Sequence, residues 1–285
     1  MSGIKERLLE SGFFLAALAS GATTLLIFGF MLVMGFPLLS GGLFFNMLMG
    51  VWAPGKGSYG IYPMVVGTLS ISLLSLLFAF PVSLGCACFS AAIGPSWLSR
   101  SFRRLVQLMT GIPTVIYGFV GIFLLVPIVR GMHGSGSGLC ILSAALMLAV
   151  LISPTMILFF NDSLDRVPKS YQDAADALGA TPSQKLLLVM LPYAKKGILS
   201  GLILAFGRAI GDTMVALMIA GNAIQVPESV FDAARALTAH IALVIAADYE
   251  SPEFKSIFVC GLVLYLFVAL MISSLRLLGV LSHRK

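Results

Sequence analysis

Six apolar runs, each long enough for a helix to cross a lipid bilayer, are the feature that most restricts what this chain can fold into. A spanning helix needs about 20 predominantly apolar residues to cover roughly 30 Å of hydrocarbon. With 59% of its residues hydrophobic and 11% charged, the chain has too few polar residues to cover a soluble fold. We therefore predict an all-α polytopic membrane protein with spans at about 13–36, 63–93, 105–129, 139–160, 197–222 and 256–280.

A seventh apolar patch, residues 236–247, is too short to be a further span. It holds only about 12 residues, and His240 interrupts it. Arg235 and Asp248 flank it. We predict an external or re-entrant helix there.

The positions of Lys and Arg predict the orientation of the spans, because short basic loops stay in the cytoplasm. Six crossings put both termini on one side of the membrane. The loops of that side contain Lys5, Arg7, Arg100, Arg103, Arg104, Arg166, Lys169, Lys185, Lys195, Lys196, Arg276, Arg284 and Lys285. The loops of the other side contain Lys56, Arg130, Arg235 and Lys255. We therefore expect both termini in the cytoplasm. The net charge of +6 follows from this topology, so we do not expect nucleic acid as a partner.

The loop between the fourth and fifth spans, residues 161–196, carries the strongest local signals. Ser170 and Asp173 have the spacing of a capping box, which predicts the start of a helix, and Gly179 ends that helix. One face of the helix carries small and apolar side chains: Tyr171, Ala174, Ala175 and Leu178. Such a face on a membrane protein favours a docking element for a soluble partner. The alternative is a helix that packs against its own bundle.

A second short helix is predicted directly after Gly179. Thr181 and Gln184 form another capping box, and Pro182 suits the first helical position. An apolar stretch follows, and Pro192 is expected to end it.

This loop resembles the cytoplasmic motif of binding-protein-dependent ABC importer permeases. That motif reads Glu-Ala-Ala, three residues, Gly, nine residues, then Ile-x-Leu-Pro, and this chain departs from it at Asp173 and Val189. The resemblance implies that the loop is a coupling helix which fits a groove on an ATPase subunit. The residues implied to couple are Asp173, Ala174, Ala175, Leu178, Gly179, Leu191 and Pro192.

Two further segments, 111-GIPTVIYGF-119 and 207-GRAIGDTMVALMIAGN-222, resemble the PstC-type permeases of phosphate importers more than their PstA-type sister subunits. The likeness covers about residues 62–280, with Asp212 where the family usually has Glu. It implies a permease core at 62–285, containing the coupling loop 161–196 and preceded by an N-terminal helix and outer loop at 1–61. It also implies a location in the plasma membrane of a bacterium or archaeon.

The implied assembly contains a PstA-like sister subunit as heterodimer partner, a PstB-like ATPase dimer and an external PstS-like phosphate-binding protein, all in contact with a membrane-embedded chain. The chain itself is then not an enzyme. It has no catalytic residue and binds no cofactor, whereas ATP and magnesium belong to the partner ATPase. The four cysteines lie in apolar runs, where cysteine is a small buried hydrophobe, so we predict no metal site.

Arg208 and Asp212 are the two charges inside an otherwise uncharged stretch from Gly197 to Pro227. A charge at the bilayer centre costs at least about 2.5 to 3.5 kcal/mol, so it must be paired or face water. Four residues apart on a helix, the two can neutralise each other, which is one interpretation. The other is that Arg208 binds a tetrahedral oxyanion through its forked guanidinium, while Asp212 orients it or accepts a hydrogen bond from a protonated phosphate oxygen. The substrate path is predicted to contain Arg208, Asp212, Thr213, Thr114, Tyr117 and Asn222.

The acidic outer segment 223–255 disfavours direct capture of a free anion, which supports delivery by a binding protein. Two alternatives to phosphate import stay open. One is an ABC permease for another oxyanion, such as molybdate, tungstate or phosphonate. The other is a self-sufficient channel or ion-driven carrier.

Overall fold

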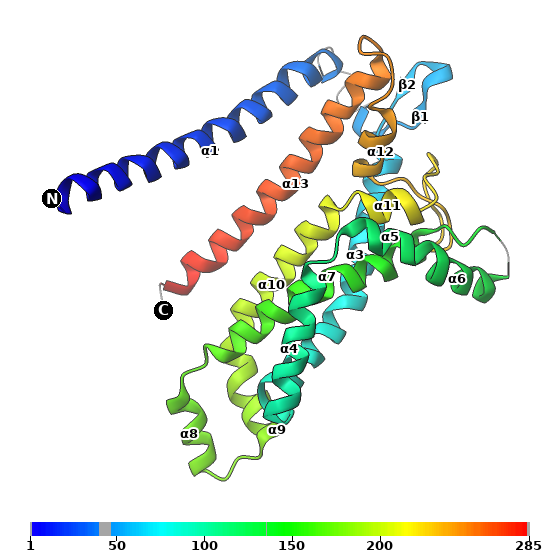
Figure 1. Ribbon diagram of the computed structural model, residues 1–285. Helices are drawn as coiled ribbons and strands as arrows, with labels where there is room; N and C mark the ends of the chain where they lie inside the picture. Colours follow the sequence, from blue (N-terminus) through cyan, green and yellow to red (C-terminus); the bar gives the residue numbers. More distant parts are fainter. Residues whose placement is uncertain (1, 40–46, 135, 284–285) are drawn as a thin grey trace.

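A computed structural model describes residues 2–39, 47–134 and 136–283 as a predominantly helical chain (Figure 1). The α-helices are α1 Ser2–Leu39, α3 Tyr62–Cys88, α4 Ser96–Thr110, α5 Thr114–Val120, α6 Val126–His133, α7 Ile141–Asp165, α8 Lys169–Ala177, α9 Pro182–Lys185, α10 Leu191–Gly211, α11 Met214–Ile219, α12 Leu237–Val244 and α13 Pro252–His283. Strands β1 (Trp52–Ala53) and β2 (Ser58–Tyr59) pair antiparallel around a 3₁₀ turn at Pro54–Lys56. Three π-helical turns lie at Phe89–Ile93, Gly121–Leu125 and Leu186–Met190.

The prediction of six spans is confirmed. The helices long and apolar enough to cross a membrane are Leu9–Phe36, Tyr62–Ile93, Thr114–Met132, Ile141–Asp165, Pro182–Gly211 and Pro252–Ser274. The short patch 236–247 contains only the eight-residue α12, in agreement with its exclusion as a span. The third and fifth spans differ from their predicted bounds.

The predicted third span, 105–129, is divided at Gly111, Ile112 and Pro113. α4 ends at Thr110, and Pro113 is extended with φ −58° and ψ 140°. A proline disfavours the helical conformation of the residue before it, so one continuous helix cannot pass Ile112 without strain. α4 is consequently a separate helix beside α7, and the span begins again at Thr114.

The predicted fifth span, 197–222, is divided at Asp212. α10 ends at Gly211, Asp212 is extended with φ −72° and ψ 132°, and α11 follows as a separate short helix. The prediction that Pro192 ends a helix is wrong, because the π-helical turn at Leu186–Met190 leads directly into α10. Pro192 therefore lies within continuous helical structure, directly after the π-helical turn, and its ring lacks the N–H that an i→i−4 hydrogen bond needs.

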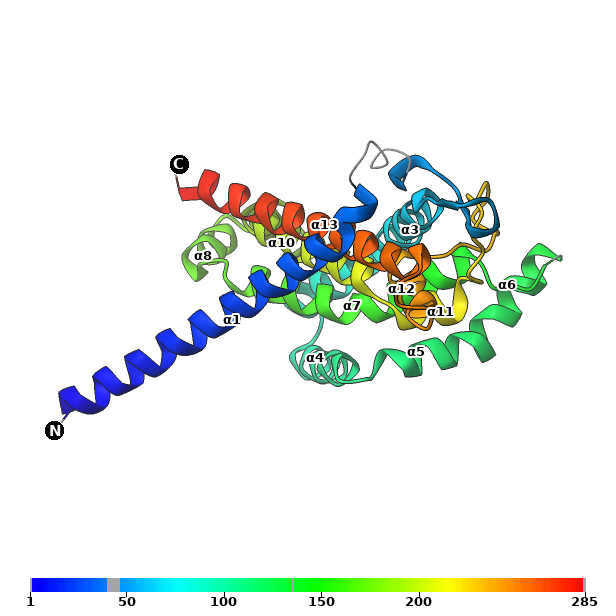
Figure 2. The same cartoon turned by 90° about the horizontal axis from the view of Figure 1, so that it is seen from above.

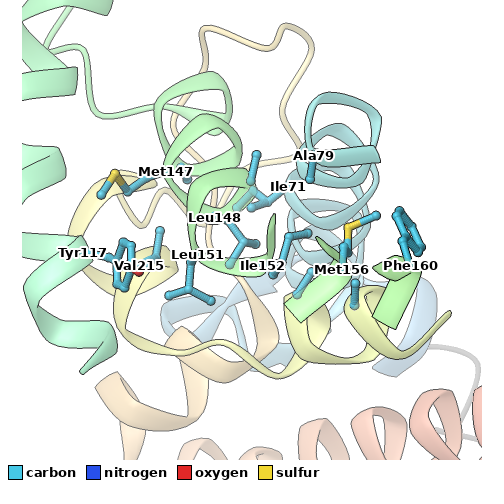
Figure 3. Close-up of a cluster of buried hydrophobic side chains, with 14 of the residues drawn as sticks. Ile71, Ala79, Tyr117, Met147, Leu148, Leu151, Ile152, Met156, Phe160 and Val215 are labelled. Carbon is cyan, nitrogen blue, oxygen red and sulfur yellow. The ribbon is translucent and has the colours of Figure 1, made fainter. Parts of the chain in front are cut away.

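The core is built around α7, which packs between α3 and α10 (Figure 3). Leu148, Ile152, Met156 and Phe160 of α7 are buried in it. α10 approaches α7 closely because it presents glycine there: a Cβ added at Gly197 would lie 2.2 Å from Ser163 Oγ. Small residues permit this kind of close helix packing in membranes.

α1 lies outside this core, and its C-terminal part packs on α13 through Phe28 on Tyr265 and Phe30 on Phe258, with ring centroids 4.7 Å and 5.6 Å apart. Figures 1 and 2 show both ends of the chain on the side of α8 and the β1–β2 hairpin on the opposite side. Arg284 and Lys285, which contribute to the predicted charge bias, lie outside the described residues.

Candidate functional site

Arg208 is held in the last turn of α10 and is half-buried. Its Nη1 donates a hydrogen bond to Thr155 Oγ1 of α7 over 2.9 Å. Thr155 follows Pro154, which lies inside α7. In the described part of the chain, Arg208 forms no salt bridge. Its charge is therefore stabilised by a neutral hydroxyl. In the described part of the chain, no carboxylate forms an ion pair with its other guanidinium N–H groups.

Asp212 is directed to the backbone of α11. Its Oδ2 accepts a hydrogen bond from Val215 N over 2.9 Å, which caps the first turn of that helix. The expected i,i+4 arrangement with Arg208 on one helix is wrong, because α10 ends at Gly211. The two charges are near enough to interact electrostatically, but the carboxylate bonds the helix terminus. The break in the span thus depends on Asp212 as a cap.

α12 is attached to this break. Thr238 Oγ1 donates a hydrogen bond to the backbone carbonyl of Asp212 over 2.7 Å, and both residues are buried. Leu237 N donates to Thr68 Oγ1 of α3 over 2.8 Å. The outer segment 223–255, whose role the sequence left open, therefore contains a helix that joins α3 to the Arg208 region.

Tyr117 of α5 packs near the break in the fifth span. Its ring is buried in the same cluster as Val215 of α11, the residue that Asp212 caps (Figure 3). Its hydroxyl donates a hydrogen bond to the carbonyl of Met109 over 3.1 Å. Thr114 begins α5 three residues earlier and is half-buried. The structure thus places Tyr117 against α11, the helix that Asp212 caps.

Asn222 lies at the far end of α11, away from the break at Asp212. It has a left-handed backbone with φ 56°, which asparagine tolerates better than most residues. Its Nδ2 donates to Leu217 O over 2.7 Å, and its carbonyl accepts from Arg235 Nε over 3.0 Å. These contacts give Asn222 a role at the end of α11.

Thr213, by contrast, directly precedes α11 and is half-buried next to Asp212.

Sequence reasoning missed Thr155 and Thr238. Both are uncharged residues in or near apolar segments, where threonine usually bonds a carbonyl of its own helix. The one available signal was that Thr155 follows a proline in a predicted span. Nothing in the sequence paired Thr238 with Asp212.

α8, the predicted coupling helix, begins one residue before Ser170, at Lys169, after the extended Pro168. The predicted Ser170 capping box is therefore wrong, since no side chain caps this helix and Pro168 starts it instead. The second box is confirmed by Thr181 and Gln184, which cap each other reciprocally. Gly179 ends α8 with φ 75°, as predicted.

Apolar side chains are exposed on α8 and directly after it, next to charged ones. Leu178 is 90% exposed, Tyr171 and Ala174 are also exposed, and Ala175 is buried, contrary to the prediction that it shares their face. Asp173 and Pro192 are exposed and Leu191 is half-buried. An exposed leucine of this kind at one end of a membrane protein is a feature of a docking surface.

The two limbs of the loop are joined to each other at two points. Lys185 Nζ bonds Asp176 over 2.9 Å, which links α9 to α8. The rings of Tyr171 and Tyr193 meet edge to face with centroids 5.9 Å apart, which links α8 to α10. α8 is therefore a fixed projection from the bundle.

Within the described residues, no group of three or more His, Cys, Asp or Glu side chains could hold a metal ion.

A bundle of six spans, with an arginine beside a broken helix and a short helix with exposed apolar side chains projecting from one end, is the architecture of a membrane permease. The chain belongs to the family described as binding-protein-dependent transport system inner membrane component, which matches residues 82–284. It is therefore the permease subunit of an ABC importer, and this family of subunits has no catalytic activity.

Two curated relatives and one solved structure illustrate the likeness. The chain is 35% identical to the probable ABC transporter permease protein YqgH of Bacillus subtilis over 80% of this chain and 73% of that protein. It is 31% identical to the phosphate transport system permease protein PstC of Pasteurella multocida over 82% and 79%. The fold is similar to a chain of a bacterial alginate ABC transporter, with a TM-score of 0.67, 15% identity and coverage of 99% and 96%.

Proposed function

We propose that this chain is the permease subunit of an ATP-driven importer of inorganic phosphate and forms half of the translocation path. Relatives about 30% identical that are named phosphate permeases support this choice of substrate. The observation that carries the proposal is Arg208, a permanently charged side chain in a spanning helix with a threonine hydroxyl and no carboxylate bonded to it. A guanidinium in this state can donate paired hydrogen bonds to the oxygens of a phosphate.

The neighbouring residues complete the proposed path. Tyr117 and Thr114 of α5 supply hydroxyl groups to the path, and Thr213 adds one at the break. Asp212 holds α11 in place and lowers the net positive charge that the anion meets. Asn222 contributes through the loop that closes the end of α11.

The test is transport by the complete importer in proteoliposomes, with Arg208→Gln and Arg208→Lys. Because a charge-assisted hydrogen bond is worth about 1.5 to 3 kcal/mol, Arg208→Gln is expected to slow phosphate uptake about tenfold or more. Arg208→Lys keeps the positive charge but loses the forked donor geometry. Its uptake is therefore expected to lie between those of the wild type and Arg208→Gln. Arg130→Gln, which removes an exposed arginine of α6, is the matched control and leaves uptake unchanged. Full uptake by an assembled, ATP-hydrolysing Arg208→Gln importer would refute the substrate role.

The proposed partners are a PstA-like sister permease, a PstB-like ATPase dimer that binds ATP and magnesium, and a PstS-like external phosphate-binding protein. One arginine cannot neutralise a phosphate that carries between one and two charges, so a second arginine from the sister subunit fits the chemistry. Both termini and α8 then face the cytoplasm of a bacterium or archaeon. The division into an N-terminal part, 1–61, and a permease core, 62–285, stays a prediction.

Docking of the ATPase is tested at Leu178. Leu178→Glu places a charge where an apolar side chain is 90% exposed, so the chain itself should fold normally. Co-purification of the ATPase with the two permeases is expected to be lost, while the sister permease is retained. Retention of the ATPase would contradict the proposed coupling surface. If the companion binding protein bound molybdate, tungstate or a phosphonate in preference to phosphate, the substrate would change and the coupling scheme would stand.

A further inference from the structure

Arg103 joins three elements at the end of the bundle that carries α8. We propose that α4 is a rigid connector between the coupling helix α8 and the Arg208 site, and that Arg103, in the middle of α4, is the positioning residue that attaches it to the end of α7. This inference rests on the proposed function, because it assigns to α4 the transmission of ATPase movement to the substrate path.

The contacts of Arg103 fix the middle of the connector. Its Nε donates to Ser90 Oγ over 2.8 Å, in the π-helical turn that ends the second span. Its Nη2 donates to Asp165 Oδ1 over 3.1 Å, and Nη1 donates to Oδ2 of the same carboxylate. Asp165 is the last residue of α7. A forked pair of this kind fixes direction as well as distance, so α4 follows the end of α7.

The link from Asp165 to the coupling helix is short and constrained. Only Arg166, Val167 and Pro168 separate α7 from α8. Val167 is buried, and its carbonyl accepts a hydrogen bond from Gln172 Nε2 of α8 over 3.1 Å. The ring of Pro168 restricts the backbone further. A displacement of α8 is therefore passed to Asp165 with little slack.

The C-terminal end of α4 contacts a residue of the proposed substrate path. Arg103 and Met109 are six residues apart on α4, which corresponds to about 9 Å along the helix. Met109, in the last turn, accepts the hydrogen bond from the hydroxyl of Tyr117, and the ring of Tyr117 lies in the same buried cluster as Val215, the residue that Asp212 caps. Ser99 and Val106, on either side of Arg103, are buried on the helix, which packs against α7. One rigid element thus contacts both the α7–α8 junction and a side chain packed at the break between α10 and α11.

A second ion pair nearby provides the matched control. Arg166 Nη2 bonds Asp162 Oδ2 over 2.8 Å, but these residues are four apart at the end of the same helix, and both side chains are exposed. This pair joins no two elements. Removal of either pair should leave the fold intact, because both pairs contact solvent and ion pairs of this kind contribute about 0 to 1 kcal/mol. Only loss of the Arg103 pair should disturb transmission.

The experiment compares Arg103→Gln, Asp165→Asn and the double variant in the complete importer. The measurement is the number of ATP molecules hydrolysed per phosphate transported. Each single variant is expected to raise this ratio severalfold, and the double variant no further, because both remove one interaction. Arg166→Gln is expected to leave it unchanged. An unchanged ratio in the single variants, additive effects in the double variant, or an equal rise in Arg166→Gln would overturn the inference.

A second measurement does not depend on phosphate as the substrate. Spin labels on cysteines introduced at the exposed positions Gln107 of α4 and Leu204 of α10, with the four native cysteines replaced by alanine, report their distance by electron paramagnetic resonance. ATP binding is expected to change this distance, and Arg103→Gln is expected to abolish the change. If the change persisted in Arg103→Gln, the connector would be excluded. If the wild-type importer showed the ATP-dependent change in distance but did not transport phosphate, the proposed function would be wrong and the connector would stand.

Discussion

Thr238 donates its hydroxyl hydrogen to the backbone carbonyl of Asp212 over 2.7 Å, so α12 is bonded to the break between α10 and α11. Asp212 in turn caps α11 through its carboxylate. α12 and the end of the spanning helix α10 therefore meet at one residue. This arrangement makes α12 part of the support of Arg208, four residues before Asp212.

Replacement of Thr238 by valine tests this support. Valine has nearly the same shape but leaves the buried carbonyl of Asp212 without its donor, which costs about 1 to 3 kcal/mol. We expect a lower melting temperature of the purified permease and slower phosphate uptake. Thr238→Ser keeps the hydroxyl and is expected to retain most of the uptake. Equal behaviour of the valine and serine variants would show that the hydrogen bond is not needed.

Replacement of Asp212 by asparagine and by alanine separates its capping role from its charge. Asparagine caps a helix about as well as aspartate, whereas alanine loses about 1 kcal/mol. Asp212→Asn is therefore expected to keep the melting temperature, and Asp212→Ala to lower it. If the carboxylate also orients Arg208 or contacts the anion, uptake falls in both variants. Normal uptake by Asp212→Asn would limit this residue to capping.

The extent of the spans could be predicted from the sequence because apolar length is a local property. The breaks within the third and fifth spans could not. At Asp212, the sequence places a carboxylate four residues after an arginine, which is also the pattern of a self-paired helix. Which arrangement forms depends on Thr238 and α12, which contact the break from 26 residues further along the chain.

The same limit applies to the site. Arg208 could be identified because a charge in an apolar run is costly and therefore needs a reason. Thr155, its hydrogen-bond partner, could not be identified because hydroxyls in spans usually bond their own helix, as Thr68 does to Met64 O and Ser72 to Thr68 O. Arg103 was counted only toward the charge bias of the loops, since nothing local links it to Asp165.

Gly179 should be intolerant of other residues. Its φ of 75° lies in the left-handed region, where a Cβ costs about 1 to 2 kcal/mol, although nothing in the described chain would contact that Cβ. Gly179→Ala is expected to reorient the turn after α8 and to weaken ATPase binding severalfold. Gly179→Asn should be milder, because asparagine tolerates this conformation. Gly55→Ala, in the outer hairpin, is the control, since it has equal space and no positive φ. The measurement is the affinity of the isolated ATPase for the detergent-solubilised permease pair.

His240 should make the stability of the outer segment depend on pH. Its side chain is 0% exposed, its ring lies edge to face on Trp52 with centroids 4.4 Å apart, and in the described part of the chain neither ring nitrogen has a hydrogen-bond partner. Burial, with the nearby charge of Arg235, lowers the pKa of His240 from 6.5 to about 4. The folded protein therefore keeps this imidazole neutral at a pH where the unfolded chain protonates it.

Since the unfolded state binds the proton more tightly, the free energy of unfolding falls as the pH decreases from 6.5 toward 4, and it is fully maintained above 6.5. The loss amounts to about 3 kcal/mol for a shift of this size. Melting temperatures of the purified permease between pH 4.5 and 7.5 should therefore decline more steeply toward acid for the wild type than for His240→Phe, which cannot titrate. His283→Phe, in the C-terminal tail, should decline as steeply as the wild type. Parallel curves for the wild type and His240→Phe would mean that this imidazole is protonated, or reached by water, in the folded state.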